Sequence, residues 1–394
     1  MGRAARAKAP QQAPPAAAGG VGESGAVPAE VHAWLEGGRD ALLEEVARLS
    51  AAKPPDKKAV AEARARLAAL ATRGADTSGV SFAGAALHGA YYDAKFVRRG
   101  ALLYRAVLAC LDPAACAAAP LLAAQLTAAG AAPRRRLRVA SLGGGPGTDV
   151  AGLFWAERHA LRFGARRSHP PGSPVSVAPP EPPGGLDVTL YDLERSWRRY
   201  MPALQRLMAP RVALDFQPCD VRSALPPPPP DAGSTEHGDG CNKALAAAAG
   251  GTHLFVLSYV AHETADAAAA SDYAFYRSLA LAAPLGAVFI FLDVRGYAAR
   301  VFDAIHDAMA AAAAAAASAP ASEPALAFVL ERFALAPPGG PLPAEAMVLL
   351  KRRPEAAPAE AAEEEGVDGS ASSSSHLAED AAAELAAASL AGDG

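Results

Sequence analysis

The chain has 394 residues, of which 51% are hydrophobic and 20% charged, and its 37 basic and 41 acidic side chains give a formal net charge of −4. Enough apolar side chains are present for a globular core, which excludes a wholly disordered protein, and the length leaves room for two or three domains. No stretch of about eighteen strongly apolar residues occurs, so no membrane-spanning helix is expected. The four cysteines form no C-x-x-C pair and have no histidine at ligand spacing, so we expect neither a metal site nor a disulfide framework.

The first 28 residues are rich in Ala, Pro and Gly and contain no acid before Glu23, which predicts disorder over 1–28. We expect the protein inside the cell, in the cytoplasm or the nucleus. Because Arg3 and Arg6 lie in this acid-poor stretch, an organellar transit peptide is the alternative interpretation.

Residues 29–133 predict a helical N-terminal cap. Apolar side chains recur at helical spacing over Trp34–Leu49 and over Val60–Leu70, and a third helix is expected over Ser81–Leu111. One face of the third helix carries four polar-tipped side chains, His88, Tyr91, Tyr92 and Lys95. That face either covers a ligand site or packs into the core with its polar tips in water.

The segment Arg138–Asp149, which reads RVASLGGGPGTD, is the most informative part of the chain. Val139–Leu142 predicts a buried strand, the glycines that follow predict a tight turn, and Thr148 and Asp149 predict the start of a helix. A helix that begins at such a turn directs its free backbone N–H groups and the positive end of its dipole at a ligand. The segment therefore predicts a nucleotide-type site in an open α/β sheet.

Six further segments predict strands: Leu186–Tyr191, Val212–Phe216, Thr252–Tyr259, Ala287–Leu292, Ala327–Arg332 and Met347–Lys351. The first four alternate with helical segments and predict parallel strands. The last two flank a Pro- and Gly-rich turn and predict an antiparallel hairpin. Asp192 follows the second strand of the series, where a carboxylate can accept hydrogen bonds from both ribose hydroxyls of a nucleoside, unless it serves as a helix cap.

The glycine spacing separates two classes of nucleotide site. The dinucleotide fingerprint G-x-G-x-x-G requires a glycine where this chain has Thr148. The spacing G-x-G-x-G instead resembles the first motif of the class I methyltransferases that use S-adenosylmethionine, and the resemblance extends over about Arg134–Arg353. It implies a Rossmann-like α/β fold over 134–354, with a mostly parallel seven-stranded sheet that ends in an antiparallel hairpin. It also implies a methyltransferase with S-adenosylmethionine as its cofactor.

The resemblance implies a cofactor site along the tips of the first strands. Its members are Ser141, Gly143, Gly144, Gly145, Gly147, Asp149, Asp192, Leu193, Asp220, Val221 and Ser258. Asp192 would bind the ribose, Asp220 the adenine amino group, and the backbone N–H of Val221 the adenine ring. A solvated loop acid is the alternative for Asp220. The chain departs from the family at Ser141, where the family has Asp or Glu, so Ser141 or Asp149 would have to hold the amino-acid end of the cofactor.

The end of the fourth strand, which faces the sulfonium in this family, carries the candidate catalytic residues. His262 and Glu263 are candidates for a general base and the group that orients it, because histidine titrates near neutral pH. Tyr259 can wall the sulfonium through a cation–π contact. Alternatively, Glu263 starts a helix over Ala265–Ala283 and His262 lies at its cap.

Low-complexity segments interrupt and follow these motifs. The Pro-rich inserts 168–185 and 225–240 predict poorly ordered surface loops, and Ala308–Ala321 is interpreted as a third insert. Residues 355–394 carry ten acids and no Lys or Arg, which predicts a disordered acidic tail. Without that tail the chain has 37 basic and 31 acidic residues, a net charge of +6.

Basic clusters at Arg134–Arg138, Arg195–Arg199 and Lys351–Arg353 are compatible with binding RNA phosphates or with solvated rims of the sheet. RNA, a protein side chain and a small molecule therefore all stay open as methyl acceptor, and the oligomeric state stays open. An NAD-dependent oxidoreductase is disfavoured by the glycine spacing and the terminal hairpin. A non-catalytic partner subunit that binds the cofactor is favoured only by Ser141.

Overall fold

The computed structural model describes residues 27–51, 56–72, 84–111, 136–167, 185–227, 241–318, 327–333 and 344–354, all within the unit Met1–Pro354. The predictions of disorder over 1–28, 168–185, 225–240 and 355–394 lie outside the described residues except at their edges. The proposed boundary between a cap at 29–133 and a catalytic domain at 134–354 stays a prediction.

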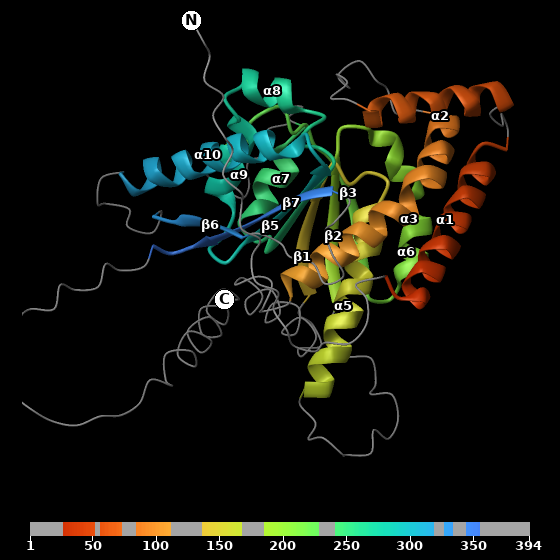
Figure 1. Cartoon of the computed structure of the whole chain (residues 1–394), viewed down its shortest axis with the longest axis horizontal. Helices are drawn as coiled ribbons and strands as arrows, with labels where there is room; N and C mark the ends of the chain where they lie inside the picture. Colours follow the sequence, from red (N-terminus) through yellow and green to blue (C-terminus); the bar gives the residue numbers. More distant parts are fainter. Residues whose placement is uncertain are drawn as a thin grey trace, which may run out of the picture. The chain divides into compact units, whose positions relative to one another are not determined.

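Seven strands form one sheet in the order β3-β2-β1-β4-β5-β7-β6 (Figure 1). The five parallel strands are β1 (Arg136–Leu142), β2 (Gly185–Asp192), β3 (Val212–Pro218), β4 (Leu254–Ser258) and β5 (Val288–Val294). Strand β7 (Ala344–Arg352) lies between β5 and β6 (Val329–Phe333) and runs antiparallel to both. The predicted mostly parallel sheet with an antiparallel closing hairpin is therefore confirmed.

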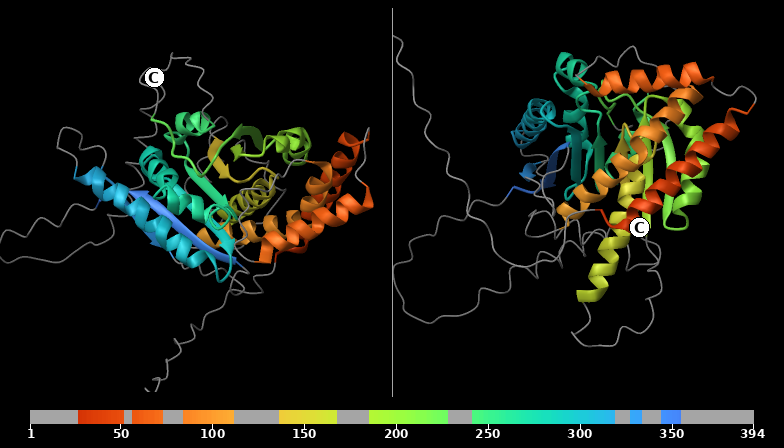
Figure 2. Two further views of the ribbon diagram at one scale, coloured as in Figure 1. Left: turned by 90° about the horizontal axis from the view of Figure 1, so that it is seen from above. Right: turned by 45° about the vertical axis from the view of Figure 1, so that its right-hand side comes forward.

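Helices cover both faces of the sheet (Figure 2). One face packs against α1 (Ala29–Leu49), α3 (Ala85–Cys110), α5 (Thr148–Arg167) and α6 (Met201–Met208), with the short helix η1 (Arg195–Tyr200) before α6 and α2 (Lys57–Thr72) against α3. The other face packs against α7 (Lys243–Ala249), α8 (Ala265–Ala270), α9 (Ala274–Ala282) and α10 (Ala298–Ala317). Successive residues of β4 alternate between the two cores: Val256 lies in the first, and Phe255 and Leu257 lie in the second. The described residues thus form a three-layer α/β structure.

Two segments differ from their predictions. The interpretation of Ala308–Ala321 as an insert is wrong for its described part, because residues up to Ala317 continue α10 and the side chains of Ala312 and Ala313 are buried. Alanine has the highest helix propensity, and a helix packed on a sheet can fill its buried stripe with alanine alone. The single helix expected over Ala265–Ala283 is divided into α8 and α9 by Asp272 and Tyr273, whose φ values of +52° and +53° are not helical.

The N-terminal helices meet the sheet layer where α3 crosses α5. A Cβ atom on Gly152 of α5 would lie 2.6 Å from the carbonyl oxygen of Gly100 and 3.0 Å from the Cβ of Leu103, both in α3. The two helix backbones are therefore in direct contact, and only glycine fits at position 152. This crossing fixes α3 next to the first turns of α5, immediately after the glycine turn.

We predict that Gly152→Ala destabilises the protein by about 1–3 kcal/mol, because the added methyl group overlaps the α3 backbone. Gly37→Ala is the matched control, since Gly37 is an exposed residue of α1 and a Cβ atom added there would have no other atom within 4 Å. That control is expected to stabilise by about 0.5–1 kcal/mol through helix propensity. Urea denaturation of both variants measures the two changes, and equal changes of the same sign would contradict the backbone contact.

Candidate functional site

The turn between β1 and α5 is closed by its own backbone and lies against the tip of β2. The Gly143 N–H donates to the carbonyl oxygen of Tyr191 at 2.8 Å, and the Gly147 N–H donates to the carbonyl oxygen of Gly144 at 2.7 Å. Gly147 has a φ of +75°, which favours glycine. A Cβ atom on Gly145 would lie 2.6 Å from Oδ2 of Asp192 and would overlap Trp197. The main chain of the turn therefore packs directly against the tip of β2 and against Trp197, at the carboxyl edge of the sheet.

Asp192, the predicted ribose ligand, is bonded to this turn. The Gly145 N–H donates to its Oδ2 at 3.0 Å, and the Glu194 N–H donates to its Oδ1 at 2.8 Å. The N-cap of η1 is Glu194, whose side chain accepts from the Ser196 N–H at 2.9 Å, so the capping role considered for Asp192 belongs to Glu194. Burial raises the pKa of Asp192 to about 6, although the two N–H donors lower it. Leu193, the next residue, is half exposed at the same edge.

Ser141 and Asp149 form one buried unit. The Ser141 Oγ donates to Oδ2 of Asp149 at 2.9 Å, and neither residue is more than 1% exposed. Burial raises the pKa of Asp149 to about 6, against opposing effects of the Ser141 hydrogen bond and the Arg99 charge. Its other oxygen, Oδ1, is buried and has no hydrogen-bond partner of good geometry, although the Ser258 hydroxyl is near enough to lower the pKa. A buried carboxylate thus stands at the end of β1, supplied by the first turn of α5.

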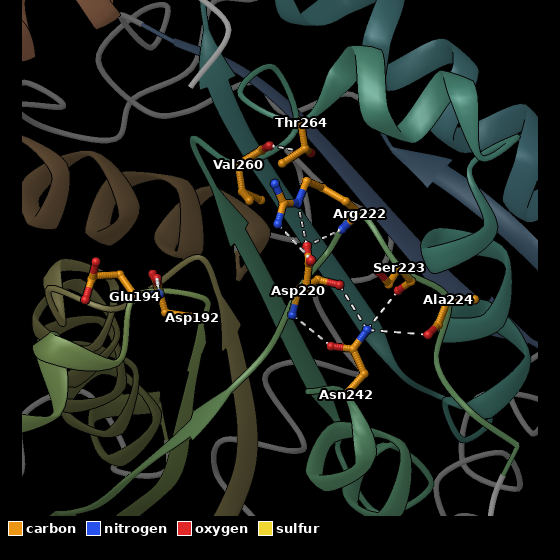
Figure 3. Close-up of polar contacts among 9 residues, drawn as sticks. All are labelled: Asp192, Glu194, Asp220, Arg222, Ser223, Ala224, Asn242, Val260 and Thr264. Atoms are coloured by element: carbon orange, nitrogen blue, oxygen red, sulfur yellow. Dashed lines mark hydrogen bonds and ion pairs between the residues drawn. The ribbon is translucent and has the colours of Figure 1, made fainter. Parts of the chain in front are cut away.

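Asp220 lies in the loop after β3, and its carboxylate is already paired (Figure 3). Arg222 donates from Nε to Oδ1 at 2.7 Å and from a terminal nitrogen to Oδ2 at 2.9 Å. The loop backbone is held by the buried Asn242, which accepts from the Asp220 N–H at 2.8 Å and donates to the Asp220 carbonyl oxygen at 2.9 Å. Val221 is buried. The loop is therefore rigidly placed, and an adenine amino group would share the Asp220 carboxylate with Arg222.

Tyr259 follows β4 in a conformation that residues with a Cβ rarely adopt. Its φ is +60°, and its N–H donates to the carbonyl oxygen of Leu292 at 2.7 Å. The guanidinium carbon of Arg99 lies 3.9 Å from the centroid of the Tyr259 ring. One face of the Tyr259 ring is therefore covered by Arg99 of α3, and a contact of the ring with a sulfonium stays a prediction.

His262 is paired with an acid that the sequence analysis did not single out. Its Nδ1 forms an ion pair with Oδ1 of Asp293, and its backbone N–H donates to Oδ2 of Asp293 at 2.9 Å. Burial lowers the pKa of His262, but the fully buried Asp293 outweighs that effect and the net shift is upward. Because Asp293 ends the strand next to β4, it orients the imidazole from the neighbouring strand tip.

Glu263, proposed as the orienting group, lies on the Arg99 side of the site. Burial raises its pKa to about 7, although the positive charges of Arg99 and His262 lower it. Four acidic side chains therefore meet at the carboxyl edge of the sheet: Asp149, Asp192, Glu263 and Asp293.

The polar face of α3 is largely packing. His88 is buried, with Nδ1 2.9 Å from the Tyr200 hydroxyl and Nε2 3.0 Å from the Ser196 hydroxyl, and its ring lies 4.2 Å from that of Trp197. Tyr91 and Tyr92 are buried, whereas Lys95 is half-buried. Three of the four side chains therefore pack into the core, but their polar tips are buried rather than in water. Arg99 of the same helix, which the sequence analysis did not single out, reaches the site and donates to the Tyr91 hydroxyl.

Members of two predicted basic clusters bind backbone carbonyl oxygens within the fold. Lys351 is buried and donates to the carbonyl oxygens of Ala280 at 2.8 Å and Leu281 at 3.2 Å, so it caps α9. Arg136, at the start of β1, donates to the carbonyl oxygen of Leu186 at 3.5 Å. In the described part of the chain, Arg195–Arg199 is the predicted cluster that has exposed arginines at the site edge.

Comparisons with known proteins give weak similarities. No protein-family model matches the chain, and no curated protein matches it. Human N-acetylserotonin methyltransferase, solved with S-adenosylmethionine, is 12% identical at a TM-score of 0.27, and the match covers 75% of this chain and 65% of that one. The neocarzinostatin O-methyltransferase NcsB1 is 16% identical at 0.28, covering 83% and 97%, and the [4+2]-cyclase SpnF is 12% identical at 0.26, covering 55% and 75%.

The order and direction of the strands in the sheet identify the fold. Five parallel strands in the order β3-β2-β1-β4-β5, with the antiparallel β7 inserted before β6, form the arrangement that the sequence resemblance implies. The chain has the class I methyltransferase fold. Among the described residues, no helix combines the length and apolarity needed to cross a bilayer, and no group of three His, Cys, Asp or Glu side chains is placed to hold a metal ion.

We predict that Glu263→Gln stabilises the protein at about pH 8 by about 1–3 kcal/mol and stabilises it much less at about pH 5. The folded pKa of about 7 lies above the ordinary value of 4.5. Stability contributed by this group is therefore complete below pH 4.5 and lost as the pH rises through 7, where a buried charge must form. Urea denaturation at the two pH values measures the gain.

The control is Glu62→Gln in α2, whose side chain is 63% exposed. It removes the same charge at the surface and is expected to change stability by less than about 0.5 kcal/mol at either pH. A gain for Glu263→Gln that did not depend on pH would contradict the burial of this carboxyl group.

Proposed function

We propose that the protein is an S-adenosylmethionine-dependent methyltransferase. The observation that carries the proposal is the contact between Gly145 and Asp192, whose N–H and carboxylate are joined at 3.0 Å across two neighbouring strand tips. It places a glycine turn beside a half-buried carboxylate, the two elements that a nucleoside requires at the edge of an α/β sheet.

The charge of the site favours a cationic cofactor over a dinucleotide. A dinucleotide site directs the N-terminal end of the helix after β1 at an anionic pyrophosphate. Here the first turn of α5 carries the buried Asp149, whose Oδ1 has no hydrogen-bond partner. That oxygen would repel a pyrophosphate and would bind the α-ammonium group of S-adenosylmethionine. The position of Asp149 therefore argues against an NAD-dependent oxidoreductase. Asp149 also supplies the carboxylate that is missing at Ser141, and this weakens the case for a non-catalytic subunit.

The residues after β4 are suited to removing a proton from an acceptor. When bound, S-adenosylmethionine supplies an electrophilic methyl group. His262 is held at Nδ1 by Asp293, which leaves Nε2 as the ring nitrogen that can take a proton. Tyr259, Glu263 and Ser258 lie around the same strand end. We therefore propose His262 as the general base, with Asp293 as its positioning residue.

Wild-type protein is expected to bind S-adenosylhomocysteine and not NAD in isothermal titration calorimetry. Gly145→Ala is expected to weaken S-adenosylhomocysteine binding about 10- to 100-fold, because the new methyl group displaces Asp192 and Trp197. Gly37→Ala is the control and should keep wild-type affinity. Binding of NAD without binding of S-adenosylhomocysteine would restore the oxidoreductase interpretation.

The methyl acceptor is identified first, by incubating the protein and methyl-labelled cofactor with cell extract and separating the label into RNA, protein and small molecules. The general base is then tested with variants that act on this acceptor. We expect His262→Ala to lower kcat about 10²- to 10⁴-fold. Asp293→Asn should also lower kcat and move the rising limb of the pH–rate profile to lower pH, because Asp293 raises the pKa of His262. An unchanged pH profile in Asp293→Asn would contradict this assignment, and failure of every fraction to take label would favour a binding subunit.

A further inference from the structure

The cofactor site includes a residue of the N-terminal helices. Arg99 lies in α3 next to Gly100, whose carbonyl oxygen is in contact with α5 at Gly152. Because the two helices touch through their backbones at this point, the side chain of Arg99 is carried to the first turn of α5, where Asp149 lies. The glycine crossing is thus the structural reason that an arginine from α3 reaches the site.

The guanidinium group of Arg99 is held in a fixed position by two aromatic residues. It donates a hydrogen bond from a terminal nitrogen to the hydroxyl of Tyr91, and its central carbon lies 5.2 Å from the centroid of the Tyr91 ring. The same carbon lies 3.9 Å from the centroid of the Tyr259 ring. A guanidinium group has five N–H donors, so the bond to Tyr91 leaves most of its donor capacity for a ligand. The arrangement immobilises the cation, and the Glu263 carboxyl group, whose charge acts on Arg99 more strongly than that of Asp149, lies on the same side.

Arg99 and Asp149 are opposite charges on neighbouring segments, because a Cβ atom on Gly100 would lie 3.5 Å from the carbonyl oxygen of Thr148. Each shifts the pKa of the other: the Arg99 charge lowers that of Asp149, and the Asp149 charge raises that of Arg99. Yet they form no ion pair within 4.0 Å, and Oδ1 of Asp149 stays without a hydrogen-bond donor, in the part of the chain that the structure describes. A cation and an anion held apart in this way are complementary to a zwitterion that fits between them.

We propose that Arg99 binds the α-carboxylate of the methionyl group of the cofactor while Asp149 binds its α-ammonium group. The inference rests on the proposed function and extends it, since it makes α3 part of the cofactor site. A planar guanidinium fork matches a carboxylate, and the buried acceptor Oδ1 matches an ammonium donor. Tyr91 and Tyr259 act as positioning residues for the fork.

Three ligands separate the two contacts: S-adenosylhomocysteine, its decarboxylated analogue that keeps the amine, and 5′-methylthioadenosine, which lacks both groups. Arg99→Gln is expected to weaken S-adenosylhomocysteine binding about 10- to 100-fold, the loss of a charge-assisted hydrogen-bond pair. Its affinity for the other two ligands should change less than about 3-fold. Asp149→Asn should weaken the two amine-bearing ligands and leave 5′-methylthioadenosine nearly unchanged.

Arg98→Gln is the matched control, because Arg98 is the exposed neighbour of Arg99 on α3 and should leave all three affinities unchanged. Retained binding of 5′-methylthioadenosine shows that each variant is folded. The proposal would be overturned if Arg99→Gln weakened the binding of all three ligands equally, or of none of them. It would also be overturned if Arg99→Gln lost methyl transfer but kept cofactor binding, because that result would assign Arg99 to the acceptor. Wild-type protein that binds none of the three ligands would instead remove the proposed function itself.

Discussion

The N-terminal end of α5 is constrained from three directions, and the rest of the site depends on it. Before the helix, Gly145 lies so close to the β2 tip that no side chain fits between it and Asp192. In the first turn, Asp149 is buried against Ser141 at the end of β1. One turn later, Gly152 touches the α3 backbone at Gly100. Strand β2, strand β1 and the N-terminal helices are therefore all positioned by one short segment, and a displacement of α5 would separate them.

The electrostatics at this edge of the sheet are unfavourable for stability alone. Asp149, Asp192 and Glu263 each have a pKa raised by burial, to about 6, 6 and 7. Burying carboxyl groups with perturbed pKa values costs folding free energy, and such groups concentrate at functional sites. A bound cofactor with a sulfonium and an ammonium group would offset this charge. The same acids that destabilise the free protein would thus favour a cationic ligand.

Local patterns in the sequence predict most of the sheet and much of the site. Each strand is a short apolar run, and Gly145 and Asp192 follow adjacent strands of a parallel sheet, so their proximity follows from the strand order. Asp293 was predictable for the same reason, since it ends the strand next to the one before His262. Arg99 was not, because no motif surrounds it and its place depends on the contact between Gly100 and Gly152, two glycines in separate helices. Composition gave a wrong prediction for alanine, because alanine is common in helices and in low-complexity inserts alike. The alanines after position 307 were interpreted as an insert, but they complete a helix whose buried stripe contains alanine.

The central claim is that a sulfonium nucleoside binds between the β1–α5 turn and the tip of β2. A crystal structure of the protein with S-adenosylhomocysteine tests it most directly. The account predicts that the ribose lies at Asp192, the backbone of Gly145 faces the nucleoside, and the homocysteine end lies between Asp149 and Arg99. Ligand density at any other edge of the sheet, or with the ribose away from Asp192, would contradict it.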